Sequence, residues 1–201
     1  MKGFLKLLLL VIVHTPVCVY SQFGDKSILP VGWYEDHSFN AVKTIKLQSS
    51  SQEIDRLKNL KGASYISATT IKTDIKFSDF SLVGILPNND KVYRLIISSE
   101  GALGLMPCFE NFTLLEGAKL SLYDIEKSRF TGSYTSKDNY ADNQTFLTSY
   151  ALGSEIVIEY IEPENLSTPS FSISKVYHFF RGLKSSNGNG FGQSPSCMLN
   201  A

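Results

Sequence analysis

The sequence predicts an all-β fold, an antiparallel β-sandwich of jelly-roll or Ig-like type with one short helix. Runs of β-branched and aromatic residues are typical of strands, and residues 93–99 are the clearest such run. In residues 119–123 polar and apolar side chains alternate, which places Leu120 and Leu122 on a buried face and their neighbours on the other. Turns that contain glycine separate such runs at near-regular spacing, as in β-sandwiches.

The N-terminal segment, residues 1–21, has the composition of a secretory signal peptide, with two lysines followed by an apolar run over residues 7–13. This run is too short to span a bilayer comfortably. We expect cleavage between Ser21 and Gln22, and a mature chain that is exported to a periplasmic or extracellular location. A buried N-terminal helix or a membrane anchor is the alternative. A histidine and a proline interrupt the apolar run early, which argues against both.

Residues 22–40 contain one proline and two glycines and predict an extended N-terminal arm rather than core strands. Trp33 and the tyrosine after it would attach this arm to the sandwich or to a neighbour. The sandwich itself is expected over residues 41–183, and its first strand over residues 41–47.

One helix is expected after this strand. Ser50 and Glu53 form a capping box, in which Ser50 is the N-cap and Glu53 reaches back. The apolar residues at helical spacing are Ile54, Leu57 and Leu60, and Gly62 closes the element.

The remaining elements are strands separated by polar turns. Residues 87–90 form a strong turn signal, because proline fixes φ and asparagine or aspartate tolerates left-handed geometry. Residues 136–149 are rich in Asp and Asn and predict a surface loop. Besides the two runs already named, strands are expected within residues 65–86, 102–105, 129–134, 155–161 and 171–180.

The charge balance excludes some classes of partner. The chain has 19 basic and 19 acidic residues, and loss of Lys2 and Lys6 with the signal leaves 17 against 19, a net charge of −2. A nucleic-acid partner calls for a basic face, so we expect none. Nothing indicates a role at a membrane surface after signal removal.

Cysteine is sparse in the mature chain, because Cys18 leaves with the signal. A disulfide between Cys108 and Cys197 is one reading in an oxidising compartment. The reading that we prefer makes Cys108 a small buried apolar residue and leaves Cys197 for a partner in another domain.

No catalytic centre is predicted. His178 lies in an aromatic strand and is expected to be either a strand-surface or a satisfied histidine, and His37 in an acidic loop is expected to be solvated. A nucleophile elbow of the Gly-X-Ser-X-Gly type is absent from the sequence. The glycines at 188, 190 and 192 follow no buried strand and open no helix, so no cofactor is expected. On its own the chain is therefore predicted not to be an enzyme.

Two further sites were considered on the surface. Oxygen ligands for calcium could come from Asp138, Asn139, Asp142 and Asn143, although such clusters in long loops are more often solvated, and no metal is expected. Sequons for N-glycosylation occur at Asn111, Asn143 and Asn165, which matter only in a source that modifies this motif.

Several segments in a fixed order carry a resemblance to a known family. They are Tyr-Arg-Leu at 93–95, Ser-Glu-Gly-Ala-Leu at 99–103, Phe-Glu-Asn-Phe-Thr-Leu at 109–114, Gly-Ala-Lys-Leu-Ser-Leu-Tyr-Asp at 117–124 and Gly-Ser-Tyr-Thr at 132–135. The order continues through 153–160 and 176–182. It resembles the N-terminal non-catalytic region of secreted bacterial trypsin-like serine endopeptidases of the lysyl-endopeptidase type, over residues 93–181 and more loosely over 29–86.

The resemblance implies a prodomain or accessory domain that assists folding of a protease domain or holds it inactive. It further implies that a serine protease catalytic domain, the partner in cis, begins near Cys197, so that residues 184–201 are a Gly/Ser/Asn linker and the start of that missing domain. A trypsin-like enzyme could process the junction, where Arg181 and Lys184 stand. We expect the cut after Lys184 or within the linker that follows.

A freestanding secreted module that binds glycan or a surface protein is the alternative. Its stacking faces would come from aromatic residues in the predicted loops and strands, namely Trp33, Tyr134, Tyr140 and Tyr150.

Overall fold

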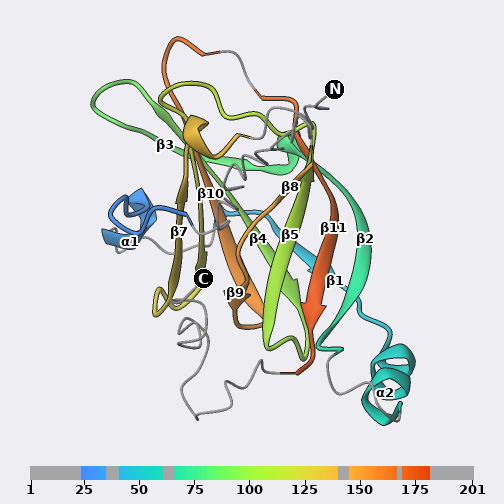
Figure 1. Ribbon diagram of the computed structural model, residues 1–201. Helices are drawn as coiled ribbons and strands as arrows, with labels where there is room; N and C mark the ends of the chain where they lie inside the picture. Colours follow the sequence, from blue (N-terminus) through green and yellow to red (C-terminus); the bar gives the residue numbers. More distant parts are fainter. Residues whose placement is uncertain (1–23, 35–40, 61–65, 140–144, 167–168, 182–201) are drawn as a thin grey trace, which may run out of the picture.

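The chain forms a mostly β structure of two sheets that face each other, as the sequence predicts (Figure 1). The computed structural model describes residues 24–34, 41–60, 66–139, 145–166 and 169–181. The expected signal peptide, with its cleavage site at Ser21 and Gln22, and the linker after Lys184 lie outside these residues. Among the described residues no helix is long and apolar enough to cross a membrane.

The first sheet has the strand order β1-β4-β10-β6-β7, and β3 also pairs with β4. Its strands are β1 (Thr44–Leu47), β3 (Ser81–Ile85), β4 (Lys91–Ser99), β6 (Lys119–Asp124), β7 (Phe130–Tyr134) and β10 (Glu155–Glu162). Most pairs are antiparallel, but β1 runs parallel to β4, with Thr44 opposite Ile96. The prediction of a purely antiparallel sheet is therefore wrong at this edge. The long connection through the second sheet makes the parallel pairing possible.

The second sheet has the order β2-β11-β5-β8, and β9 also pairs with β5, at Gly104 and Leu105, whereas β8 pairs at Cys108 and Phe109. Its strands are β2 (Ala68–Lys76), β5 (Gly104–Glu110), β8 (Phe146–Leu147), β9 (Ala151–Leu152) and β11 (Ser172–Phe179). All of these pairs are antiparallel. The residues expected to form a surface loop at 136–149 thus contribute a short strand, because Phe146 is buried in the core.

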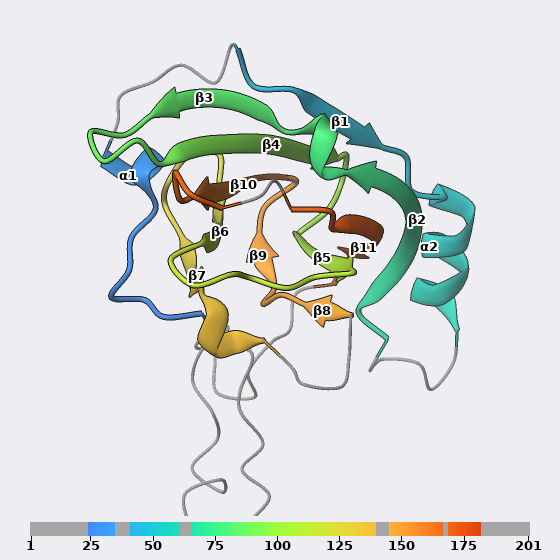
Figure 2. The same ribbon diagram turned by 90° about the horizontal axis from the view of Figure 1, so that it is seen from above.

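Two α-helices lie at opposite sides of the domain (Figure 2). The predicted helix is α2 (Ser51–Asn59), and it ends before Leu60, which is 47 % exposed. A second helix, the single turn α1 (Val31–Tyr34), lies in the arm that was expected to be extended. The prediction of one helix is therefore incomplete. Short 3₁₀ turns occur at η2 (Phe77–Asp79) and η3 (Ser136–Asp138).

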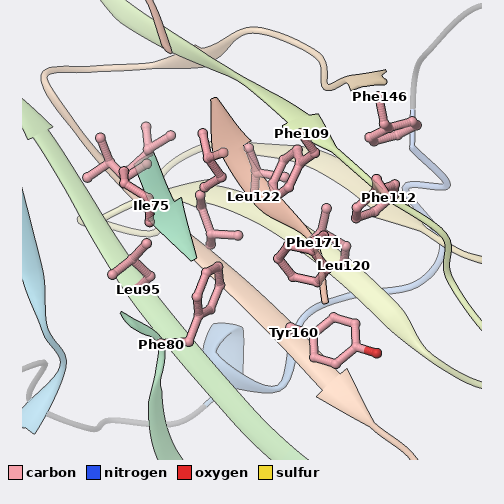
Figure 3. Packing of buried hydrophobic residues seen from close by; sticks show 14 of the residues in the cluster. Ile75, Phe80, Leu95, Phe109, Phe112, Leu120, Leu122, Phe146, Tyr160 and Phe171 are labelled. Atoms are coloured by element: carbon pink, nitrogen blue, oxygen red, sulfur yellow. The ribbon is translucent and has the colours of Figure 1, made fainter. Parts of the chain in front are cut away.

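The main core lies between the two sheets and is rich in aromatic rings (Figure 3). Phe171 is at its centre and contacts five other rings, with centroid distances of 5.3–5.8 Å, from Phe77, Phe80, Phe109, Phe112 and Tyr160. Such tilted and edge-on pairs add to the stabilisation from burial. Leu120 and Leu122 are fully buried here, as the alternating pattern predicts.

The outer face of the first sheet is also buried, which the alternating pattern did not predict. Ser121 and Tyr123 point away from the main core, yet they are 2 % and 0 % exposed. A small second cluster forms on this face, where Tyr123 packs with Ile96 and Val157 against Trp33. The residues before and within α1 therefore cover a face that would otherwise be solvated.

The predicted turn at 87–90 is confirmed. The Leu86 amide donates to the Asp90 carbonyl oxygen at 2.8 Å, and Asn89 has a φ of 65°. Asparagine tolerates this left-handed conformation better than most residues, so the sequence and the turn agree.

Candidate functional site

Arg181, one of the two basic residues expected at the processing junction, follows β11 and lies against α2. Its guanidinium donates to three backbone carbonyl oxygens, those of Lys58 (2.7 Å), Ile66 (3.1 Å) and Leu57 (3.2 Å). The last carbonyls of a helix lack intrahelical partners and carry partial negative charge, so a cation there is stabilising. Lys184 and Cys197 lie outside the described residues, and processing at this junction stays a prediction.

The helix that Arg181 contacts begins as the sequence predicts. The Ser50 hydroxyl accepts a hydrogen bond from the Glu53 amide at 3.2 Å. The Glu53 carboxylate does not complete the expected box, because it pairs with the Arg56 guanidinium one turn later, at 2.7 Å. That hydrogen bond lowers the pKa of Glu53. This part of the capping prediction is wrong.

The apolar face of α2 packs on the end of the domain. Ile54 and Leu57 form a small cluster with Phe180, and Ile66 packs against it. This cluster is separate from the main core, so α2 is held by few apolar contacts. The Arg181 guanidinium, 5.6 Å from the centroid of the Phe180 ring, adds a polar attachment at the same place.

His178 links the two sheets beside this junction. Its Nδ1 lies 2.9 Å from the Ser99 hydroxyl, and both residues are at most 1 % exposed. Burial lowers the pKa of His178, and the positive charge of Lys58 on α2 lowers it further. Of the two expected readings, a satisfied histidine agrees with these contacts, and a strand-surface histidine is wrong because the side chain is buried. His37 lies outside the described residues.

A buried ion pair lies on the outer face of the first sheet, and the sequence analysis did not identify it. Glu159 on β10 and Arg94 on β4 are direct cross-strand neighbours, with the Arg94 Nε 2.8 Å from a Glu159 oxygen. Their side chains are 0 % and 3 % exposed. The Tyr123 hydroxyl donates to the same carboxylate at 3.2 Å.

The start of α1 provides two further hydrogen bonds to this carboxylate. The backbone amides of Val31 and Gly32 donate to the two Glu159 oxygens at 2.7 and 2.9 Å. Gly32 is required here because a Cβ would overlap the Tyr123 hydroxyl and approach the Arg94 guanidinium within 2.8 Å. The Glu159 charge thus holds α1 on the sheet.

The residues before α1 are attached to β7. Asp25 and Ser133 exchange two backbone hydrogen bonds, of 2.8 and 3.0 Å, and the Ser133 hydroxyl donates to the Ile28 carbonyl oxygen. Gly24 and Gly132 approach so closely that a Cβ on either would overlap the backbone of the other, and Gly132 has a φ of 114°. We call residues 24–34 the N-terminal strap.

A second buried carboxylate lies at the far end of β10. Glu162 is 1 % exposed and accepts from the Lys91 ammonium at 2.9 Å, while its other oxygen has no protein partner among the described residues. Burial, together with the nearby Glu162 charge, raises the pKa of Tyr160 to about 12. The positive charge of Lys91 compensates the negative charge of Glu162, so the ion pair has a structural role.

The aromatic residues considered for ligand stacking mostly pack against the domain. Tyr134 is 1 % exposed, lies in the core against Phe146, and its hydroxyl accepts from the Ser149 amide. Tyr150 packs edge-on against Phe179 with its hydroxyl on the Leu103 carbonyl oxygen. The expectation that Tyr134 offers a stacking face is wrong, because its ring belongs to the core. Trp33, which belongs to the strap, packs edge-on against Tyr123 of β6. Tyr140 lies outside the described residues.

The residues considered for calcium have other partners where the structure describes them. The Asp138 carboxylate accepts from the Thr135 amide at 2.7 Å. The Asn139 side chain exchanges two hydrogen bonds with the Leu114 backbone. Across the described part of the chain no three acidic, His or Cys side chains gather at metal-binding distance. Asp142 and Asn143 lie outside it.

The remaining predicted sites are single residues. Cys108 is 2 % exposed and unpaired within the described residues, as expected for a small buried apolar residue, and burial raises its pKa. Asn111 and Asn165, the acceptor residues of two sequons, are exposed.

No protein-family model and no curated protein matches the chain.

Proposed function

We propose that this chain is the non-catalytic N-terminal prodomain or accessory domain of a secreted serine endopeptidase of Lys/Arg-specific type. It would assist the folding of a protease domain or hold that domain latent. In this proposal the two facing sheets are a β-sandwich of jelly-roll or Ig-like type, exported by the signal peptide, and the catalytic domain in cis is the partner.

One observation supports the proposal most. The segments that carry the resemblance fall on β4, β10, β6 and β7, which are consecutive in the first sheet, and on β5 and β11, which are neighbours in the second. The resemblance therefore covers paired strands of both sheets and their turns rather than scattered surface residues. A likeness of this kind is expected from a shared domain.

The packing of the domain also supports the proposal that the chain is a separate folding unit. The ring cluster around Phe171 and the Arg94–Glu159 pair give the domain its own buried contacts. A domain with a core of its own can act on a second domain from outside. Processing after Lys184 or within the following linker would then release the catalytic domain.

The test has a genetic step and a biochemical one. The native transcript would be sequenced beyond codon 201, and the frame should continue into a domain with His, Asp and Ser in trypsin-like order. That domain would then be denatured and refolded with and without the two-sheet domain in trans. A Phe171→Ala variant, whose core is damaged, serves as the control.

We expect a higher yield of refolded protease, or inhibition of the folded protease, with the native domain only. A frame that stops after codon 201 without a catalytic frame nearby would refute the proposal, as would a domain that changes neither the yield nor the activity of the protease.

A further inference from the structure

We propose that β2 is a self-association edge, along which two copies of this chain pair antiparallel with Lys72 of each copy opposite Asp74 of the other. The second sheets of the two copies then form one continuous sheet, with a twofold axis at Thr73. The inference concerns the assembly of the domain and goes beyond the proposed function.

The outer edge of β2 has no partner strand among the described residues. β2 is nine residues long and stands at the end of the second sheet, where it pairs on one side only, with β11 (Figure 1). A long edge strand presents a row of amides and carbonyl oxygens to which another extended strand can add. β2 is therefore able to accept a further strand.

The other sheet edges in the described part of the chain are short, interrupted or covered. The N-terminal strap pairs with β7 through Asp25 and Ser133. β8 and β9 have two residues each, β1 has four, and the register of β3 shifts between Leu82 and Gly84. Such features are common means of preventing association at sheet edges. β2 stands apart from these edges by its length.

The backbone of β2 directs alternate groups to its outer edge. The residues that flank the strand both face β11, because the Phe180 amide donates to the Ser67 carbonyl oxygen at 2.9 Å and the Phe77 amide donates to the Phe171 carbonyl oxygen at 3.2 Å. Alternate residues of a strand direct their backbone groups to opposite sides. The even-numbered residues of β2 therefore direct theirs to the outer edge, and they include Ala68, Thr70, Lys72 and Asp74.

The exposed face of β2 carries charges of both signs. Its exposed residues are Thr70, Lys72, Asp74 and Lys76, and this alternation continues past the point where the register with β11 shifts. Lys72 lies directly opposite Lys175 of β11, so two like charges are neighbours on this face. Like charges at directly opposed positions are destabilising. A carboxylate on the other side of Lys72 would compensate this repulsion.

A second copy supplies that carboxylate in one register. With Thr73 opposite its counterpart, Lys72 of each copy faces Asp74 of the other, and the symmetry makes this pair occur twice. On the inner side of the strand Ile71 then faces Ile75. A slide of two residues in one direction places Lys72 opposite Lys72, and in the other direction Asp74 opposite Asp74. Charge therefore selects this register of self-pairing.

The Asp74 side chain can make the new contact without loss to the fold. It is 82 % exposed and lies 3.7 Å from the Lys76 ammonium, which is 65 % exposed. An ion pair as exposed as this contributes little to stability. The Asp74 carboxylate can therefore turn to the partner's Lys72, and we expect substitutions at both positions to leave the domain folded.

Reversal of the two charges tests the register. Lys72→Asp and Asp74→Lys each place like charges opposite one another in the dimer, whereas the double variant restores both pairs with the signs exchanged. The measurement is sedimentation velocity of the purified full chain between about 1 µM and 1 mM. We expect the native chain and the double variant to dimerise, and each single variant to have a dissociation constant at least about tenfold higher.

A mixture of the two single variants is a stricter test. One then carries two lysines at positions 72 and 74 and the other two aspartates, so the mixture should form a heterodimer that neither variant forms alone. Glu126→Lys is the matched control, because it makes the same change of net charge as Asp74→Lys at an exposed residue between β6 and β7. It should leave the dissociation constant unchanged.

Amide hydrogen exchange places the interface on the strand. As the concentration of the native chain rises, exchange should slow at the outward amides of Thr70, Lys72 and Asp74. Circular dichroism of every variant verifies that its sheets are intact.

A native chain that stays monomeric up to about 1 mM would overturn the inference. So would a dimer that persists in both single variants, because its interface would then lie elsewhere, and so would folded variants that neither the double reversal nor the mixture restores to dimers. None of these results involves a protease domain, so failure here is distinguishable from failure of the proposed function.

Discussion

Replacement of Glu159 by glutamine should strongly destabilise the domain, and the structure allows the cost to be worked out. The carboxylate accepts four hydrogen bonds, from Arg94, Tyr123 and the amides of Val31 and Gly32. A glutamine has one acceptor oxygen, and its amide nitrogen would face a donor. The Arg94 charge, 3 % exposed, would also lose its ion pair with the Glu159 carboxylate.

Removing one member of a buried ion pair costs about 3–5 kcal/mol, because the other charge stays buried without compensation. For a chain of this size each kcal/mol lowers the melting temperature by about 2–4 °C, so the expected decrease is roughly 6–20 °C. The assays are thermal unfolding and urea denaturation, both followed by far-UV circular dichroism. Tyr123→Phe, which removes one hydrogen bond of 3.2 Å, should cost only about 1 kcal/mol.

Glu155→Gln, at the other end of the same strand, is the matched control and should change stability by less than about 0.5 kcal/mol. If Glu159→Gln unfolds at the same urea concentration as this control, the reasoning is refuted, because the pair would then be solvated and the strap would not depend on it.

Three further predictions concern other contacts. Because burial keeps the pKa of His178 below its unfolded value of 6.5, the unfolded chain takes up the proton first, so stability should fall as the pH drops below about 6.5. His178→Asn should flatten this part of the curve, measured by urea midpoints between pH 7.5 and 5; an unchanged slope would count against it. Gly132→Ala should detach the N-terminal strap, because its Cβ would overlap Gly24 and its φ of 114° disfavours alanine; amide hydrogen exchange of the strap should increase, and equal protection would contradict this. Phe171→Ala should cost about 3–5 kcal/mol by cavity formation, measured by thermal unfolding, and a loss below about 1 kcal/mol would show that the site collapses.

The strands were predictable because their signals are local. The alternation at 119–123 and the β-branched run at 93–99 correspond to β6 and β4, and the capping serine marks the start of α2. These patterns depend on residues that are close in the sequence, so no knowledge of the partner strands is needed.

The strap and the ion pair beneath it depend on contacts between distant segments, and local patterns do not record these. Arg94 and Glu159 each interrupt an apolar run, which was the available signal. A charge within a strand that is otherwise apolar on both sides indicates a buried partner. The α1 turn could not be foreseen, because it is held by Glu159 on a strand 127 residues away rather than by its own sequence.

The strand order has a consequence for the rate at which the domain forms. Among the described strands only β3–β4 and β6–β7 pair with their immediate successors, whereas β1–β4, β4–β10 and β2–β11 join segments far apart in the chain. Proteins dominated by such non-local pairings fold in about milliseconds to seconds, because loops must close before contacts can stabilise them. During that time the unpaired strands and the ring cluster around Phe171 are exposed to other nascent chains. A newly synthesised molecule should therefore be most vulnerable to aggregation before β10 joins β4, and least once that pairing closes the first sheet.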